Sequence, residues 1–217
     1  MRQGVLGGTF DPVHVGHLDV ARAAASALSL DHVQLMPAKL PPHRMPPQAS
    51  AHDRYAMVEL AVAGDPRLIA SDLDLHAAGP SYTMATLDRL EEQGVDLGTL
   101  CFITGADAFR DLPSWRDYPA ILDRCYFVAV SRPGCRATDL RKALPGLASR
   151  MVDAGQPLPV KPAVILVDAP TAPVSSTDIR RRLASGQSIE GLVPPAVASY
   201  IERHGLYRAA LSKEPNG

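Results

Sequence analysis

The residues best suited to chemistry stand in one eleven-residue string near the start of the chain, GGTFDPVHVGH, from Gly7 to His17. Adjacent glycines let the backbone approach an anion closely, and the free N–H groups at the start of a following helix attract phosphate. His14 and His17 are three residues apart, so on a helix they share one face. The string therefore predicts a phosphate-binding turn whose backbone groups come from Gly7, Gly8, Thr9 and Phe10.

Other readings of this string have less support. It matches neither G-x-x-x-x-G-K-[ST] nor G-x-G-x-x-G, which are the usual glycine-rich nucleotide motifs. Two histidines at this spacing could also bind zinc, but the string lacks the H-E-x-x-H pattern and a nearby third ligand. The three cysteines, at 101, 125 and 135, are irregularly spaced, which favours neither a zinc site nor a disulfide framework. We expect no metal ion bound by the protein itself.

A second candidate phosphate site lies far along the chain, in the segment VSSTDIR from Val174 to Arg180. Ser176 and Thr177 at a helix start are expected to cap that helix and to offer hydroxyl groups to phosphate. Arg180 adds a planar guanidinium that suits a triphosphate. Taken alone, the segment fits an ordinary capped helix that exposes a row of arginines better than it fits a phosphate site.

These segments need elements to position them, and the hydrophobic pattern predicts alternating strands and helices. Short apolar runs typical of buried parallel strands are separated by longer stretches that fit helices. This alternation predicts an α/β fold, a Rossmann-like doubly wound parallel sheet with helices on both faces and a short helical C-terminal end. The expected strands are 5–6, 33–36, 68–73, 100–103, 126–130 and 164–167, and the expected helices are 15–29, 52–63, 83–93, 117–123, 176–185 and 195–204.

Length and composition limit the class of protein. The 217 residues fit a single domain, expected over 1–208, with a frayed tail at 209–217. Twenty-two basic and 23 acidic residues give a net charge of −1, whereas nucleic-acid binders carry a strong basic excess. No signal peptide pattern and no long apolar span are present. We therefore expect a cytoplasmic protein that binds neither nucleic acid nor membrane.

The Gly7–His17 string resembles the G-G-x-F-D-P-x-H-x-G-H signature of the nucleotidyltransferase superfamily, and the Val174–Arg180 segment resembles its I-S-S-T-x-I-R element. In that superfamily the two histidines contact the phosphates of ATP. The resemblance implies catalytic roles for His14, His17 and Arg180. It also implies that Ser176 and Thr177 bind ATP.

Two further segments narrow the resemblance to the nicotinate-nucleotide adenylyltransferases. PSYTMATL, residues 80–87, resembles an element of that family in which a helix start receives the nicotinate carboxylate, a role for Tyr82 and Thr83. Trp115 ends a segment similar to the family's G-x-D-x-x-x-x-L-x-x-W, and its ring would stack on the pyridine. A half-buried core position is the other reading of this tryptophan.

The remaining motifs of the resemblance supply charged or polar residues. PAKLPPHR, residues 37–44, is similar to the family's P-A-x-x-P-P-H-K and contributes Lys39, His43 and Arg44 to substrate binding, with arginine where the family usually has lysine. Gly105 and Asp107 would bind ATP, Asp107 either by holding a ribose hydroxyl or by orienting its loop. Arg132, in SRPG, would reach phosphate or belong to a surface turn. The resemblance as a whole covers residues 4–207.

The resemblance implies an enzyme that transfers AMP from ATP to the 5′-phosphate of nicotinate mononucleotide, forming nicotinate adenine dinucleotide and pyrophosphate in NAD biosynthesis. Its partners would be these two substrates, with Mg²⁺ brought by ATP. Two alternatives stay open: another acceptor, such as nicotinamide mononucleotide or phosphopantetheine, and a nucleotide-binding protein without catalysis. The sequence leaves open whether the chain forms a homo-oligomer.

Overall fold

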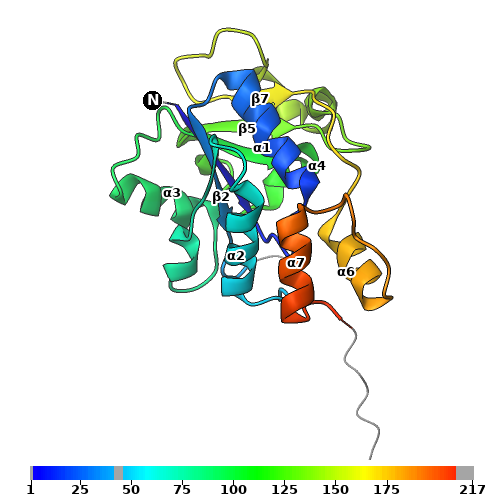
Figure 1. Ribbon diagram of the computed structural model, residues 1–217. Coiled ribbons are helices and arrows are strands. Elements are labelled where there is room, and N and C mark those ends of the chain that lie inside the picture. The colour runs from blue at the N-terminus through cyan, green and yellow to red at the C-terminus, as the bar shows by residue number, and fades with distance from the viewer. Residues whose placement is uncertain (1, 42–45, 209–217) are drawn as a thin grey trace, which may run out of the picture.

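The computed structural model describes residues 2–41 and 46–208 (Figure 1). Its strands are β1 (Gln3–Gly8), β2 (His32–Pro37), β3 (Leu68–Ala70), β4 (Cys101–Gly105), β5 (Tyr126–Val130), β6 (Met151–Asp153) and β7 (Val164–Val167). Its α-helices are α1 (Val15–Leu28), α2 (Ala51–Val62), α3 (Thr83–Glu92), α4 (Ala106–Arg110), α5 (Leu140–Ala143), α6 (Ser176–Ala184) and α7 (Pro195–His204). Short 3₁₀ helices lie at Leu73–His76, Leu112–Ser114, Ala120–Asp123, Ala137–Asp139 and Pro145–Arg150.

The strands form one seven-stranded sheet in the order β3-β2-β1-β4-β5-β7-β6. Every pair of neighbouring strands in it is parallel. The chain builds outward from β1 to β3 on one side and then returns to place β4 on the other side of β1. This reversal between β1 and β4 is where open α/β sheets bind ligands. The predicted doubly wound parallel fold is confirmed.

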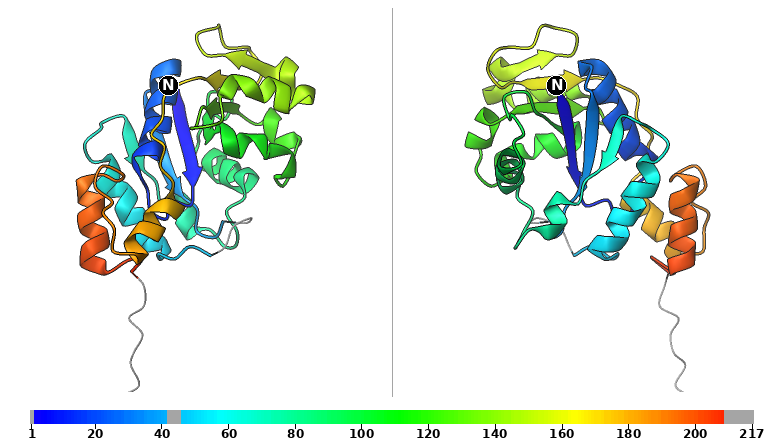
Figure 2. Two further views of the ribbon diagram at one scale, coloured as in Figure 1. Left: turned by 90° about the vertical axis from the view of Figure 1, so that its right-hand side faces the viewer. Right: turned by 60° about the vertical axis from the view of Figure 1, so that its left-hand side comes forward.

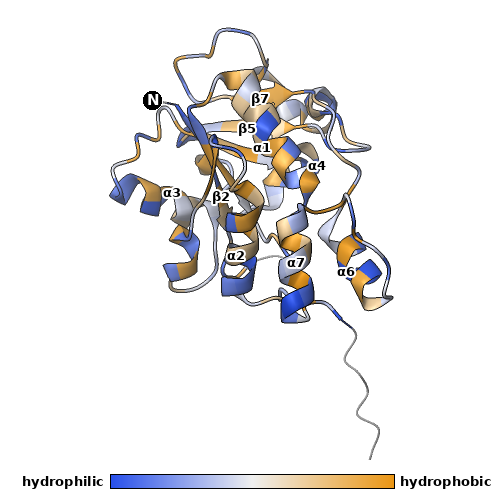
Figure 3. Ribbon diagram, in the orientation of Figure 1, coloured by the Kyte–Doolittle hydropathy of each residue, from blue (hydrophilic) through white to orange (hydrophobic). Residues whose placement is uncertain are grey.

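Two hydrophobic clusters, one on each face, hold the helices to the sheet. Side chains alternate between the faces along a strand, and in β5 Val128 and Val130 join the first cluster while Phe127 and Ala129 join the second. The first cluster packs under α1, α2, α6 and α7, and the second under α3, α4 and α5. The C-terminal helices α6 and α7 are amphipathic, with hydrophobic and hydrophilic residues on each (Figure 3).

Two of the predicted elements were wrong in detail, and one strand was not predicted. The strand expected at 68–73 ends at Ala70, and a 3₁₀ helix follows it. The helix expected at 117–123 is only a 3₁₀ turn from Ala120, because a proline at 119 lacks an N–H and biases the residue before it toward extended backbone. The edge strand β6 lies in a stretch with no clear pattern, since three residues at an edge need little periodicity. The tail expected at 209–217 lies outside the described residues.

The sheet directs the loops of interest to one end of the molecule. In Figure 2 the blue arrow of β1 points toward the end where α6 and α7 lie. The loops that follow β1, β2, β4, β5 and β7 therefore gather beyond the carboxyl ends of the strands. None of the helices in the described ranges is long and apolar enough to cross a membrane.

Candidate active site

The turn after β1 combines a positive φ at Phe10 with a close approach between Gly8 and the Phe10 ring. Phe10 has a positive φ of 49° and is almost fully buried. A Cβ atom on Gly8 would lie 3.0 Å from the Phe10 ring, so the glycine leaves room for that ring beneath the turn. The Phe10 ring also meets the edge of the His17 ring, with centroids 4.9 Å apart. The predicted glycine turn is thus packed directly against the histidine pair.

The two histidines lie together, as their spacing predicts. Their rings stack with centroids 3.7 Å apart, and the His14 backbone N–H donates to Nδ1 of His17 at 3.3 Å. His14 is only 2% exposed. Burial, reinforced by the charge of Arg132, lowers the pKa of His14 to about 3. His14 is therefore a neutral imidazole at physiological pH, and its buried Nδ1 has no hydrogen-bond partner among the described residues.

Three side chains from distant elements hold carbonyl groups of the same turn. Arg54 of α2 donates to Thr9 O at 2.7 Å, and Arg180 of α6 donates to Asp11 O at 2.6 Å. The hydroxyl of Ser176 donates to Pro12 O at 2.9 Å. The first and second phosphate segments, more than 160 residues apart, are therefore directly bonded.

The caps of α6 differ in detail from the prediction. The residue that caps the helix is Ser175, whose hydroxyl accepts the N–H of Asp178, and not Ser176. The Ser176 hydroxyl instead points back to the turn, while Thr177 Oγ1 accepts from Arg180 at 3.4 Å. The guanidinium of Arg180 thus stands at the helix start with one side bonded to the turn and one to Thr177.

Arg132 joins the loop after β5 to the start of α1. Its guanidinium donates to Gly16 O at 3.1 Å and to Val174 O at 2.9 Å. A Cβ atom on Gly16 would lie 2.7 Å from that guanidinium, which explains the glycine between the two histidines. Arg132 therefore connects the two phosphate segments instead of lying in a free surface turn.

Gly105 and Asp107 adjoin the same arginine. A Cβ atom on Gly105 would meet the Asp107 carboxylate and would lie 3.0 Å from the Arg132 side chain. Asp107 stands in the first turn of α4 with its side chain exposed. Its carboxylate is therefore accessible at the carboxyl end of β4, and both roles expected for Asp107 stay predictions.

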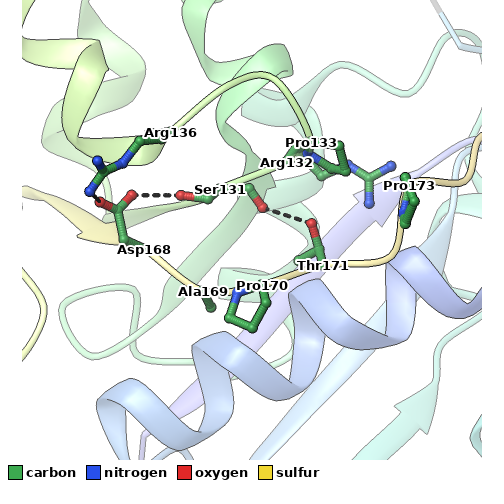
Figure 4. A pocket seen from close by; sticks show the side chains of 9 residues that line it. All are labelled: Ser131, Arg132, Pro133, Arg136, Asp168, Ala169, Pro170, Thr171 and Pro173. Carbon is green, nitrogen blue, oxygen red and sulfur yellow. Dashed lines mark hydrogen bonds and ion pairs between the residues drawn. The ribbon is translucent and has the colours of Figure 1, made fainter.

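A cavity of about 500 Å³ opens beside Arg132, between the ends of β5 and β7 (Figure 4). On one wall the Asp168 carboxylate accepts from Ser131, Arg136 and Thr138. Burial by itself would raise the pKa of Asp168, but these hydrogen bonds outweigh it and hold the pKa well below its usual range. The wall is thus a fixed ionic cluster, and Thr171, which donates to Ser131 O, forms the neighbouring edge.

The segment after β2 bridges the turn and the start of α3. Ala38 N donates to Gly8 O at 2.8 Å, and Arg54 donates to Ala38 O at 2.7 Å. On its other side, Lys39 N donates to the Ser81 hydroxyl and Lys39 Nζ donates to Ala77 O, both at 3.0 Å. Lys39 is therefore bonded to the segment before α3. His43 and Arg44, also expected here, lie outside the described residues.

The acceptor segments predicted around α3 also meet. Tyr82 is the residue before the first turn of α3, which begins at Thr83. The guanidinium of Arg116 lies 4.7 Å from the centre of the Tyr82 ring, so the neighbour of Trp115 contacts the helix start directly. Trp115 is partly buried against the second cluster. Tyr82, Thr83 and Trp115 are thus held in one region, with an arginine that the sequence analysis did not single out.

Sequence reasoning missed two other residues. Asp11 lies inside the first string and is 4% exposed, yet it holds several groups from other elements. Tyr207 donates to the Asp11 carboxylate at 2.8 Å from the far end of the chain. Only the buried hydrogen bond between Tyr207 and Asp11 identifies these two residues, and no local sequence pattern predicts that bond. The described residues contain no group of three His, Cys, Asp or Glu side chains that could bind a metal ion.

Comparisons with known proteins agree with this arrangement. The model of the cytidylyltransferase-like family matches residues 5–182. A Cronobacter sakazakii protein named probable nicotinate-nucleotide adenylyltransferase is 43% identical over 215 residues, covering 96% of each chain. A Pseudomonas fluorescens protein of the same name is 43% identical over 210 residues, covering 96% of this chain and 98% of its own.

A solved structure shares the fold. It is the Plasmodium falciparum nicotinic acid mononucleotide adenylyltransferase complexed with NaAD, at a TM-score of 0.71 and 17% identity, covering 95% of this chain and 97% of that one. The match to the family model includes Gly7–His17 and Val174–Arg180, and the two relatives and the solved structure each cover 95% or more of this chain. The chain therefore belongs to the cytidylyltransferase-like family and, within it, to the nicotinate-nucleotide adenylyltransferases.

Proposed function

We propose that the chain transfers the adenylyl group of ATP to the 5′-phosphate of nicotinate mononucleotide, releasing pyrophosphate. A phosphate oxygen of the mononucleotide bonds to the α-phosphorus of ATP, and the bond from that phosphorus to the pyrophosphate oxygen breaks. The attacking phosphate is already an anion, because its second pKa is about 6. The reaction therefore needs alignment and charge neutralisation more than it needs a general base.

One observation carries this proposal: the segment after β2 is bonded to both predicted binding regions. Through Ala38 it contacts Gly8 of the phosphate turn, and through Lys39 it contacts the residues before α3. The same segment thus contacts both the region assigned to the triphosphate and the region assigned to the acceptor. That arrangement supports a reaction between two phosphate-bearing substrates more than it supports storage of one nucleotide.

We assign the ATP side as follows. The backbone from Gly7 to Phe10, the first turn of α1 and the imidazoles of His14 and His17 face the phosphates. Arg180 neutralises charge on the leaving pyrophosphate and the Thr177 hydroxyl donates a hydrogen bond to it, while Mg²⁺ enters bound to ATP as part of that substrate. We assign the cavity beside Arg132 to the adenosine end, because Arg132 borders both this cavity and the start of α1.

We assign the acceptor to the start of α3. The N–H groups of its first turn and the partial positive charge of the helix end suit the nicotinate carboxylate. The ring of Trp115 offers an aromatic face to the pyridine, and the guanidinium of Arg116 adds a positive charge beside Tyr82. This environment favours the acid over the neutral amide.

The test is pyrophosphate release with ATP and Mg²⁺, comparing nicotinate mononucleotide with nicotinamide mononucleotide. We expect at least about a tenfold preference in kcat/KM for the acid. Only the acid carries a carboxylate that can bind the N–H groups in the first turn of α3. A His17→Ala variant serves as the blank and should lose orders of magnitude in kcat. Equal rates would overturn the carboxylate assignment, and no release with either acceptor would overturn the reaction.

A further inference from the structure

Tyr207 occupies an unusual place for a residue near the end of the chain. Its side chain is 8% exposed, and its hydroxyl lies 2.8 Å from Oδ1 of Asp11, 196 positions earlier. Its φ is +62°, a backbone conformation that bulky residues rarely adopt. Strain of this kind persists only where surrounding contacts hold it. The fold therefore bends its last described residues to bring this hydroxyl to the first motif.

The Asp11 carboxylate is shared among four groups. Oδ1 accepts the Tyr207 hydroxyl and the N–H of Ala49 at 3.1 Å. Oδ2 accepts the N–H of Gln48 at 2.9 Å and lies 3.7 Å from Arg180. Since the carboxylate is buried, water cannot replace a partner that is removed. Each of these four groups therefore fixes the place of the others.

Arg180 is bound to the same residue in two ways. It donates to Asp11 O at 2.6 Å and pairs with the Asp11 carboxylate. A shift of Asp11 thus moves the guanidinium assigned to the triphosphate. Burial, followed by the charge of Asp11, raises the pKa of Tyr207 far above its ordinary value. Its hydroxyl therefore stays protonated and remains a donor, facing Asp11, Arg180 and Arg54.

We propose that Tyr207 is a positioning residue of the ATP side: its hydroxyl orients Asp11, and Asp11 sets where the Arg180 guanidinium lies. This inference rests on the proposed role of Arg180. Tyr207 does not touch substrate in this scheme. It acts through a series of contacts: the Tyr207 hydroxyl bonds to Asp11, and Asp11 contacts Arg180 at the phosphate turn.

The test compares Tyr207→Phe with a matched control, Tyr126→Phe. Both tyrosines are 8% exposed, and Tyr126 donates to Pro159 O at 2.5 Å at the opposite, amino end of the sheet. We expect Tyr207→Phe to lower kcat/KM for ATP about tenfold while KM for the mononucleotide changes less than about twofold. Tyr126→Phe should leave both unchanged. Equal kinetic effects of the two variants would overturn the inference.

A second measurement separates positioning from loss of packing. If Tyr207 acts through Arg180, Tyr207→Phe should weaken ATP binding about tenfold in the normal chain but less than about twofold in an Arg180→Ala background. Calorimetric titration with ATP and Mg²⁺ measures this without turnover, so it also decides the inference if no pyrophosphate is released. Equal weakening in both backgrounds would overturn it.

An additional variant covers the case in which Tyr207→Phe does not fold. Asp11→Asn keeps the size of the side chain but replaces one carboxylate oxygen by an NH₂ group, which cannot accept the Tyr207 hydroxyl or a backbone N–H. It should weaken ATP binding at least as much as Tyr207→Phe, with unchanged affinity for the mononucleotide. Normal ATP affinity in Asp11→Asn would overturn the inference that Tyr207 acts through Asp11.

Discussion

At the scale of single residues, the two stacked imidazoles have unequal surroundings. His14 is buried beside the Arg132 guanidinium and is neutral, whereas His17 is partly exposed next to the Phe10 ring. A buried neutral imidazole can donate one hydrogen bond to a phosphate oxygen without the cost of burying a charge. In the proposed reaction, His14 would supply phosphate with a fixed donor and His17 with a more accessible one.

The burial of His14 predicts how stability depends on pH. The folded pKa of about 3 lies below the ordinary 6.5, so only the unfolded chain binds this proton between those values. The stability that the neutral, buried His14 contributes is complete well above pH 6.5. It is lost as pH falls toward 3, by at most about 1.4 kcal/mol per pH unit. Between about pH 8 and about pH 5, this one group should lower the free energy of unfolding by about 2 kcal/mol.

Denaturant unfolding of the normal chain and of His14→Asn at both pH values measures this term. The loss between the two pH values should be about 2 kcal/mol smaller in His14→Asn, because asparagine does not titrate. His52→Asn removes an exposed histidine of α2 and should keep the full loss. The same pH dependence in all three chains would contradict a buried neutral His14.

At the scale of elements, side chains that hold backbone carbonyls determine how the loops meet. Arg54, Arg180 and Ser176 hold three carbonyls of the turn after β1, and Arg132 holds one from α1 and one just before α6. An arginine makes such double contacts because its planar fork presents several donors at fixed angles. Hydrogen bonds between loops, together with the His14–His17 contacts within the first segment, therefore assemble the site.

Arg132→Lys tests this assembly. Lysine keeps the charge but cannot reproduce the fork that reaches Gly16 O and Val174 O together. We expect kcat/KM for ATP to fall about tenfold, measured by pyrophosphate release. Arg150→Lys is the matched control, since Arg150 also donates to a backbone carbonyl, that of Leu122, but stands just before β6 at the amino end of the sheet. A similar loss of kcat/KM in both variants would argue against a role for Arg132 in joining the start of α1 to the segment before α6.

At the scale of the whole molecule, most residues assigned to the two substrates lie on different faces of the sheet, although α4, which carries Asp107, lies on the same face as α3. The helices around the phosphate turn, α1, α6 and α7, pack on the first cluster, whereas α3, α4 and Trp115 belong to the second. Loops from both faces come together beyond the carboxyl ends of the strands. Changes on one face should therefore affect one substrate more than the other.

Trp115→Ala tests this division. Loss of the aromatic face should raise KM for nicotinate mononucleotide about tenfold, while KM for ATP stays within about twofold. Trp115→Phe, which keeps a flat ring, should recover most of the affinity. Steady-state kinetics with each substrate varied in turn measures both constants. Equal increases in the two KM values would show that the faces are not independent.

The sequence alone determined the fold class, because buried parallel strands need continuous apolar runs and the helices between them need longer amphipathic ones. It also indicated most residues of the candidate site, since glycines, paired histidines and helix-start hydroxyls act through local geometry that spacing reveals. The six expected strands and five of the six expected helices are present, with Leu68–Ala70 shorter than predicted.

Only the tertiary structure decided which groups from distant elements meet. Arg132 contacts Gly16 across 116 positions, Arg180 contacts Asp11 across 169, and Tyr207 contacts Asp11 across 196. No periodicity encodes such pairs, because each depends on the path of the chain through the whole sheet. Burial adds a second property that spacing cannot supply: it makes His14 neutral and leaves Asp11 dependent on partners from the far end of the chain.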